Sequence, residues 1–440
     1  MLGALGAAEP ASALPPIRHV FVIVLENQPA STTFGPRSPA PYLSRTLRAQ
    51  GAYLPNYFGI GHNSNDNYIA MISGQAPNVL TQSDCPTYAE LVPGTIGAAG
   101  QAAGLGCIYP TGVPTIASQL YANGLTWRDY NQGMGADPIR EASQCGHPGV
   151  GMIDNTQRAT AADSYATRHN PFVYFHSIID DTTRCDTHVV NFDPLPRDLS
   201  NAALTPNYVF ITPDLCNDGH DAPCANGQPG GLRQADSFLR TWVPRITSSP
   251  AFLEQAGLLI ITFDEAVTSD ASSCCGEIAG PGSPLPGITG SGGGDVGAVL
   301  LSPCIAPGTV TQTPYNHYAM LRSVEDLFGL SHIGYAALPA LQPLGSDVFT
   351  RTCGAPPTVH VHGRVHGSRG KLRWSASGAS VRYFVVQERT RSGGWRTLLA
   401  STSRHSLSFS VRGEHRYRFR VRAVEESGTY SLWATKAVAG

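Results

Sequence analysis

Charged residues are scarce in this chain of 440 residues. Only 14% of them are Asp, Glu, Lys or Arg, and lysine occurs at just two positions, Lys371 and Lys436. Long apolar runs are absent too, because none approaches the roughly 18 consecutive apolar residues of a membrane-spanning helix. We therefore predict no transmembrane segment. The hydrophobic share of 42% excludes a mostly disordered protein and allows a sizeable buried core.

Cysteine pairs of the kind that bind structural zinc are also missing. No two of the ten cysteines have CxxC spacing, and all ten lie before residue 354, mostly in sequence rich in Gly, Pro and Asp. An even number of cysteines in such loops indicates disulfide bonds, which are typical of exported proteins. Residues 1–16 contain a run of small residues but no basic start and no full apolar segment. We interpret them as a leader remnant and expect a secreted protein.

Acidic residues become rare in the last part of the chain. Residues 1–356 carry a net charge of −13 and residues 357–440 carry +11, and such a step predicts a domain boundary. The basic residues of the second part alternate along predicted strands and do not cluster in sequence. We therefore favour a solvated domain, with no nucleic-acid partner and at most a weak contact with anionic surfaces.

Short apolar runs predict the strands of a sheet that is buried on both faces. These runs cover residues 19–25, 172–175, 208–211, 257–263 and 296–301. Helical spacing of apolar residues appears between several of them, over residues 41–50, 235–246 and 318–328. Strands that alternate with helices predict an α/β sandwich with a mainly parallel central sheet. Ligands of such sheets bind at the carboxyl ends of the strands.

Polar residues follow or adjoin these runs at five places. The places are Glu26-Asn27, residues 61–68, residues 213–221, Asp264-Glu265 and Asn316-His317. Each alone has an ordinary explanation as a helix cap or a turn, but five together at predicted strand ends indicate one site. Oxygen and imidazole ligands suit a divalent cation. Such a cation lowers the pKa of a coordinated serine hydroxyl and makes it a nucleophile toward phosphorus.

The sequence around these places resembles, in order, the motifs of the phosphoesterase family. Six blocks carry the resemblance: VIVLENQ, HNSNDNYIAMISG, RHNPFVYF, PDLCNDGHD, LLIITFDEA and YNHYAMLRSVEDLFGL. This family unites bacterial acid phosphatases with phosphatidylcholine-type phospholipases C, and the block order is most similar to secreted actinobacterial acid phosphatases. The resemblance implies an alkaline-phosphatase-like catalytic domain over residues 17–353 and a hydrolase that acts on phosphoric ester bonds.

The resemblance also implies a role for individual residues. Implied ligands of one or two divalent metal ions are Glu26, Asn27, Ser64, Asp218, Asp264 and Glu265. Implied catalytic residues are the nucleophile Ser64 and two histidines that assist the transition state, His220 and His317. Implied substrate contacts are Asn27, His62, Asn67 and His169. The chain departs from the family where Asn63 and Asp66 replace prolines, Gln28 replaces an arginine and Phe263 replaces a tryptophan, changes that affect substrate range more than reaction class.

We therefore expect a secreted, metal-dependent acid phosphatase that hydrolyses phosphate monoesters through a phosphoserine intermediate. A phosphorylated small molecule or a lipid headgroup, phosphoinositides included, is the expected substrate. Two alternatives stay open: a phospholipase C-type phosphodiesterase that uses the same site on phospholipids, and a binding protein on an inactive phosphatase scaffold. The short chain favours the monoesterase, and the retained side chains in every block weigh against the inactive scaffold.

Residues 357–440 predict a separate small antiparallel β-sandwich. Apolar and polar residues alternate over residues 372–374, 381–387, 395–399, 407–411 and 417–423, with Gly and Ser turns between them. Trp374 and Tyr417 resemble the core tryptophan and the corner tyrosine of fibronectin type III modules. A spacer or stabilising module is the expected role of this part.

Overall fold

The computed structural model describes residues 14–439 of the chain apart from a few short gaps. The gaps are residues 284, 286–289, 354–356, 379–380, 390–393, 412–415, 426–430 and 432. Residues 1–13 of the predicted leader remnant lie outside the described part. Within the described part, no helix is long and apolar enough to cross a bilayer.

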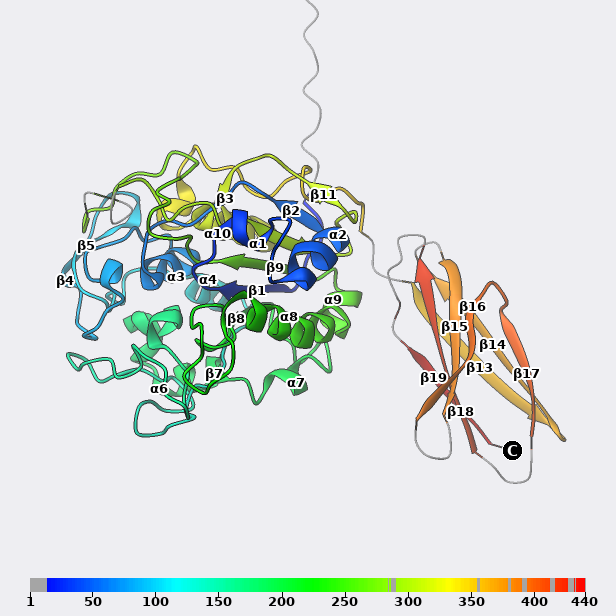
Figure 1. Cartoon of the computed structure of the whole chain (residues 1–440). Coiled ribbons are helices and arrows are strands. Elements are labelled where there is room, and N and C mark those ends of the chain that lie inside the picture. The colour runs from blue at the N-terminus through cyan, green and yellow to red at the C-terminus, as the bar shows by residue number, and fades with distance from the viewer. Residues whose placement is uncertain are drawn as a thin grey trace, which may run out of the picture.

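A sheet of eight strands forms the centre of the first part of the chain (Figure 1). In spatial order the strands are β11 (Thr309–Val310), β2 (Ala52–Leu54), β10 (Ala298–Leu301), β9 (Leu258–Phe263), β1 (Val20–Leu25), β8 (Tyr208–Thr212), β6 (Trp127–Asn131) and β7 (Val189–Asn191). The five strands from β9 to β7 run parallel, whereas β10 is antiparallel to both β9 and β2. The sheet is thus mainly parallel, as the alternating pattern predicts.

Apolar β-branched residues explain why β1 lies at the centre of this sheet. All six residues of its VFVIVL sequence are buried, and it pairs with β8 on one side and β9 on the other. A strand that is covered on both faces needs such a continuous apolar run. The predicted strands at 19–25, 208–211, 257–263 and 296–301 are confirmed.

The predicted strand at residues 172–175 is wrong. Pro171–Tyr174 forms a 3-10 turn whose four residues are all buried. Pro171 has a fixed φ and no backbone N–H, which favours the start of a turn over a place inside a sheet. The apolar run therefore lies in the hydrophobic core, although it does not form a strand.

Helices surround the sheet, and two of them position the site described below. Helix α3 (Ser64–Ser73) packs against α10 (His317–Phe328), and α8 (Gly231–Thr247) packs against a π-helical turn at Tyr42–Leu47. Helix α3 ends at Gly74, whose φ of 66° suits glycine. The Asn316 side chain caps α10 by accepting a hydrogen bond from the backbone amide of Ala319. The predicted helical segments 41–50, 235–246 and 318–328 are confirmed.

Shorter elements complete the first part of the chain. They are α1 (Ala30–Thr33), α2 (Arg48–Gln50), β3 (Tyr57–Phe58), β4 (Val92–Ile96), β5 (Ala102–Leu105), α4 (Ile116–Ala122), α5 (His176–Ile179), α6 (Thr182–His188), α7 (Leu195–Asp198), α9 (Pro250–Glu254) and β12 (Tyr315–Asn316). Short 3-10 turns also occur at Thr81–Ser83, Ala98–Gly100, Thr167–His169 and Gly334–Ala337.

All ten cysteines form disulfide bonds, as their even number predicts. The pairs are Cys85–Cys107, Cys145–Cys185, Cys216–Cys224, Cys274–Cys275 and Cys304–Cys353. Two of these bonds bear on the site. Cys85–Cys107 ties down the segment that follows α3, and Cys216–Cys224 closes the turn that follows β8.

Residues 357–439 form an all-β region of antiparallel sheets. One sheet contains β13 (Thr358–His366), β14 (Arg369–Ser377) and β17 (Ser406–Ser410). The other contains β16 (Trp395–Thr402), β15 (Val381–Arg389), β18 (Arg416–Glu425) and β19 (Ala434–Ala439). Their inner faces share a core that includes Leu372, Trp374, Phe384, Val386 and Phe419. The prediction of an antiparallel all-β region is confirmed.

Candidate active site

Three carboxylates meet at the carboxyl ends of neighbouring parallel strands. Glu26 directly follows β1, Asp264 directly follows β9, and Asp218 lies in the turn after β8. Because β8, β1 and β9 are adjacent and parallel, their ends lie along one edge of the sheet (Figure 1). All three side chains are fully buried. This edge is where the polar residues after each apolar run predict a site.

Ser64 lies against two of these carboxylates. It is the first residue of α3, and its hydroxyl donates a hydrogen bond of 2.8 Å to Oε2 of Glu26. The hydroxyl is also within hydrogen-bonding reach of Asp264. The phenol of Tyr68, one turn along the same helix, donates to Oε1 of Glu26 at 2.5 Å. Glu26 therefore fixes the side chains of both α3 residues.

Asn27 faces the same pair of carboxylates. Its backbone amide donates to Oδ1 of Asp264 at 3.0 Å. Its side-chain amide lies against the same two carboxylates, and with its nitrogen turned toward them it donates to Oε2 of Glu26 at 2.9 Å and to Oδ1 of Asp264 at 3.1 Å.

His169 lies between Glu26 and Asp218. Its Nε2 is 3.4 Å from Oε2 of Glu26 and its Nδ1 is 3.5 Å from Oδ2 of Asp218. Neither ring nitrogen makes a hydrogen bond within the described structure, nor does Oδ2 of Asp218, although all of these atoms are buried. The ring stacks on Tyr68 with 5.2 Å between centroids. One ligand atom from each of Glu26, His169 and Asp218 lies within 4.8 Å of the other two.

The electrostatics of this cluster favour a bound cation. Burial and then the charges of Asp264 and Asp218 raise the pKa of Glu26 well above its usual value. Burial also raises the pKa of Asp218 and Asp264. Burial, followed by the positive charges of Arg168 and His220, lowers the pKa of His169 well below its usual value, so its ring is neutral and has a lone pair to offer. Buried carboxylates with an unpartnered imidazole fit a divalent metal ion.

The start of α3 gathers donors for an anion. The backbone amides of Ser64 and Asn65 both donate to the carboxylate of Asp84, at 3.0 Å in the case of Asn65. Arg168 lies beyond, with its Nε 3.7 Å from Oδ2 of Asp84 and its Nη2 3.3 Å from Nε2 of His220. Helix N-termini with a nearby arginine suit phosphate groups. In this chain Asp84 already occupies these donors.

Four of the predicted site residues use their polar atoms elsewhere. His62 pairs with Glu265, from Nδ1 to Oε2 at 2.5 Å, and its Nε2 lies 3.0 Å from the carbonyl of Asp270. Both ends of the Asn67 amide bond the backbone of residues 60–63. His317 donates from Nε2 to the carbonyl of Asp264 at 2.6 Å and accepts from the phenol of Tyr57 at Nδ1. These contacts hold the loop before Ser64 and the backbone of Asp264 in place.

His220 lies at the exposed side of the cluster. Its backbone amide donates to Oδ1 of Asp218 at 2.7 Å, and its ring bonds Asp221 at 2.8 Å. Asn27 and Gln28 are half-buried beside it, and the Gln28 amide donates to the carbonyl of Gly219. The structure thus brings Glu26, Asn27, Ser64, Asp218 and Asp264 together with His169, and it places His220 at their rim.

Sequence reasoning missed three neighbours of Ser64 and the carboxylates. Tyr68 and Arg168 lie inside two of the family blocks, next to residues that were singled out, so the blocks held a signal for them. Asp84 lies outside every block, and only its contact with the amides at the start of α3 reveals it.

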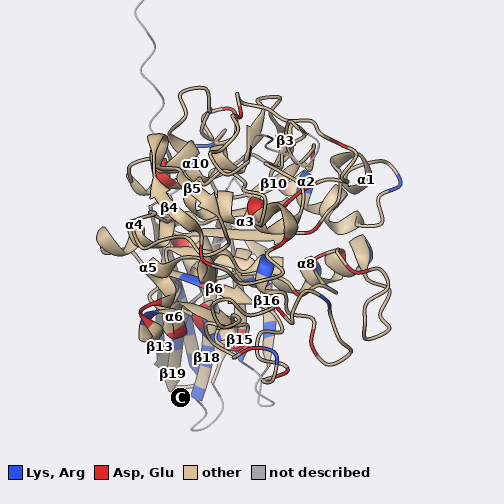
Figure 2. Cartoon of the chain, turned by 90° about the vertical axis from the view of Figure 1, so that its left-hand side faces the viewer, with Lys and Arg blue, Asp and Glu red and all other residues tan. Residues whose placement is uncertain are grey.

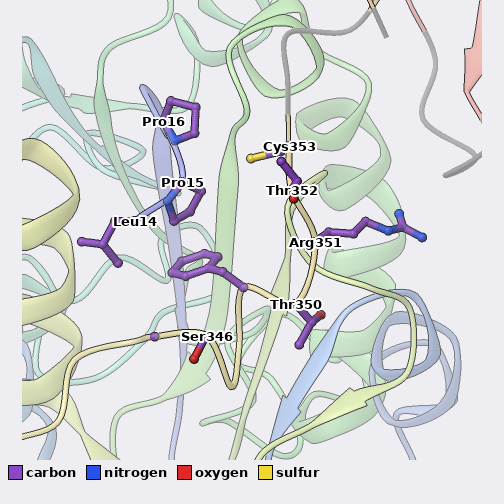
Figure 3. A pocket seen from close by; sticks show the side chains of 10 residues that line it. Leu14, Pro15, Pro16, Ser346, Thr350, Arg351, Thr352 and Cys353 are labelled. Carbon is purple, nitrogen blue, oxygen red and sulfur yellow. The ribbon is translucent and has the colours of Figure 1, made fainter. Parts of the chain in front are cut away.

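A cavity of about 410 Å³ lies elsewhere in the molecule (Figure 3). Its lining includes Leu14, Pro15 and Pro16, which precede β1, together with residues 349–353. Because it adjoins the amino end of β1, it lies at the opposite edge of the sheet from Glu26. None of the predicted site residues lines it.

Comparison with known proteins identifies similar chains. The phosphoesterase family matches residues 36–331. A Kluyveromyces lactis protein named "Probable acid phosphatase" is 25% identical over 72% of this chain and 59% of its own length. An acid phosphatase of Aspergillus fumigatus is 24% identical over 66% of this chain and 51% of its own length. The phosphatidylinositol-3-phosphatase of Mycobacterium tuberculosis is 26% identical over 74% of this chain and 82% of its own length. The chain thus spans only about half to three fifths of the first two relatives.

Protonation of His317 is expected to destabilise the fold. Burial lowers its pKa to about 4, below the ordinary value of about 6.5. The stabilisation from the neutral ring is therefore complete above about pH 6.5 and is lost as the pH falls toward 4. His317→Gln should unfold more easily than wild type at pH 7.5, and this difference should shrink by up to about 1.4 kcal/mol per pH unit below 6.5. Urea denaturation between pH 7.5 and 5 measures it; a constant difference would contradict a neutral buried ring.

Proposed function

This chain belongs to the phosphoesterase family, and we propose that it is a secreted, metal-dependent phosphatase that hydrolyses phosphate monoesters through a phosphoserine intermediate. The position of Ser64 carries the proposal. Its hydroxyl is hydrogen-bonded to Glu26 and reaches Asp264. A nucleophile and carboxylates that suit a cation therefore meet at one residue.

The residues that would hold a divalent cation are those of the carboxylate cluster. One side of this cluster consists of Glu26, Asn27, Ser64 and Asp264. The other side consists of His169 and Asp218, which also adjoin Glu26. When bound there, such a cation lowers the pKa of the serine hydroxyl and offsets the charge of the phosphate. The unpartnered nitrogens of His169 favour a ligand role for this residue over the substrate contact that the family blocks imply.

The phosphoryl transfer that we propose uses Ser64, residues around it and His220. The Ser64 hydroxyl loses its proton to Glu26, which already accepts its hydrogen bond, and the Ser64 oxygen forms a bond to phosphorus. The ester bond to the substrate alcohol breaks, and the departing oxygen takes a proton from His220 at the rim. Arg168, whose guanidinium lies beside His220, stabilises the negative oxygens. Water then attacks phosphorus and gives a proton to His220, the bond between phosphorus and the Ser64 oxygen breaks, and Ser64 regains its proton from Glu26 as inorganic phosphate leaves. His317, His62, Asn67 and Glu265 act as positioning residues.

Substrate range and location are further parts of this proposal. The Mycobacterium tuberculosis relative, named for phosphatidylinositol 3-phosphate hydrolysis, matches this chain over most of both lengths and favours phosphoinositides as substrates. Five disulfide bonds favour an oxidising compartment outside the cell.

We also propose two domains, a catalytic domain over residues 17–353 and a fibronectin type III-like domain over residues 357–440. In support, the two hydrophobic cores have no residue in common, and the second is built around Trp374 and Phe384.

Replacement of Ser64 tests the nucleophile. Ser64→Ala should lower kcat for p-nitrophenyl phosphate by roughly 1000-fold or more, because it removes the hydroxyl that Glu26 orients for attack. Ser73→Ala is the matched control: Ser73 is buried on the same helix, but its hydroxyl donates to the carbonyl of Ile69, so activity should change little. Acid-quenched wild type should carry phosphate on Ser64 by mass spectrometry. Retained activity in Ser64→Ala, or turnover of bis-p-nitrophenyl phosphate in preference to the monoester, would contradict the proposal.

Removal of metal tests the carboxylate cluster. A chelator should abolish phosphate release, and a divalent cation should restore it, because the buried carboxylates need a positive partner. Glu26→Gln should weaken cation binding by at least about tenfold in calorimetry. Glu141→Gln serves as control, since Glu141 is a buried carboxylate that bonds the amide of Gly135 outside the cluster. Full activity after exhaustive chelation, with metal content verified by elemental analysis, would rule out metal dependence.

Replacement of Asp84 tests its competition with the substrate. In Asp84→Asn the side chain can still accept the amide hydrogen bonds at the start of α3, but its negative charge is gone. Repulsion of an incoming phosphate dianion should fall by about 1 kcal/mol, which lowers KM for p-nitrophenyl phosphate roughly fivefold. Asp180→Asn, at an exposed acid paired with His176, should leave KM unchanged. A higher KM in Asp84→Asn would show that the carboxylate assists binding.

A further inference from the structure

The outer face of one C-terminal sheet is uniformly basic. Alternate residues of β13 and β14 point outward from it, because side chains in a strand alternate between faces. The outward residues that carry basic groups are His360, His362, Arg364, His366, Arg369, Lys371 and Arg373, and all seven are exposed. We call this set the basic face. The inward residues between them, such as Leu372 and Trp374, belong to the core.

Strand register places the basic residues of β13 directly opposite those of β14. His362 lies opposite Arg373, Arg364 opposite Lys371, and His366 opposite Arg369. On the other side of β14, the residues that neighbour Arg369, Lys371 and Arg373 on β17 are serines. Alternation along the sequence therefore gathers the basic residues on one surface. Figure 2 shows lysine and arginine coloured along the strands of this region.

Nothing in the described structure neutralises the basic face. The three strands β13, β14 and β17 contain no Asp or Glu, and none of the seven residues forms an ion pair with another described residue. Two arginines of the other sheet differ in this respect. Arg396 pairs with Glu388 at 2.8 Å, and Arg420 bonds Gln387 and lies over the rings of Trp395 and Trp433.

Positive groups also surround the three histidines of the basic face. The charged groups that face them from β14 are Arg369, Lys371 and Arg373, and β19, which packs against β13, contributes Lys436 near Gly363. β18 faces β13 with the apolar residues of the core. Every charged neighbour in this set is positive, so none of them offsets the attraction for anions.

The shape of the face favours a planar partner. Nine-residue strands give it a length of about 30 Å, and its other outward residues are small, chiefly serines on β14 and β17. No aromatic side chain points outward from these three strands to stack on nucleic-acid bases. We propose that the basic face docks this protein onto bilayers rich in anionic lipid. This proposal stands independently of the phosphatase activity.

Vesicle sedimentation of the full chain tests the proposal. Wild type should bind vesicles that contain anionic phosphatidylglycerol, bind neutral phosphatidylcholine vesicles weakly, and dissociate in high salt. The triple variant Arg369→Ser, Lys371→Ser, Arg373→Ser should lose roughly 100-fold in partitioning, since each basic residue contributes about fivefold near an anionic surface. The control triple variant Arg389→Ser, Arg396→Ser, Arg418→Ser removes the same charge from exposed positions on the other sheet and should lose far less.

Equal melting temperatures show that the variants fold. Equal losses in the two triple variants, or equal binding to anionic and neutral vesicles, would each overturn the proposal. So would binding to soluble polyphosphate without binding to vesicles.

Discussion

Like charges are forced together at one edge of the central sheet, and the rest of the site follows from that constraint. Parallel pairing of β1 and β9 holds Glu26 beside Asp264, because each directly follows its strand, and the turn after β8 adds Asp218. Burial of such a cluster costs free energy unless hydrogen bonds or positive charge offset it. The protein supplies hydrogen bonds from Ser64, Tyr68 and Asn27, but these donors do not neutralise the charge. A cation, as in the function proposed above, would offset this charge, and the neutral imidazole of His169 lies where it could share such an ion.

Around this cluster, the residues of the family blocks divide into two groups. One group faces the carboxylates, and the other holds backbone in position. His317 belongs to the second group, since it bonds the carbonyl of Asp264, and so does Asn67, which bonds the loop that leads to Ser64. A short motif can therefore retain every polar residue for geometry alone, and residue type does not by itself separate a contact with substrate from a support behind it.

Much of this arrangement was predictable from sequence. Continuous apolar runs identify β1, β8 and β9, and the polar residues that end them identify the site, because strand direction fixes where both lie. Local sequence does not predict those features that depend on contacts between distant parts of the chain. Residues 172–175 are apolar enough for a strand, but Pro171 makes them a turn. Asp84 has no sequence signal, since its role depends on a disulfide-bound loop that returns to the start of α3. The basic residues after residue 357 appeared dispersed, because alternation along a strand looks like dispersion until register is known.

The disulfide Cys216–Cys224 encloses a ring whose members include Asp218 and His220. Two residues of the proposed chemistry thus depend for their placement on a covalent link that spans only eight positions. Heterologous production in a reducing cytosol would leave this ring open while the apolar sheet still assembled. Such material would look well folded by circular dichroism and yet be inert. Protein for activity measurements should therefore be prepared by oxidative refolding or periplasmic expression, so that a lack of activity is not caused by an open disulfide.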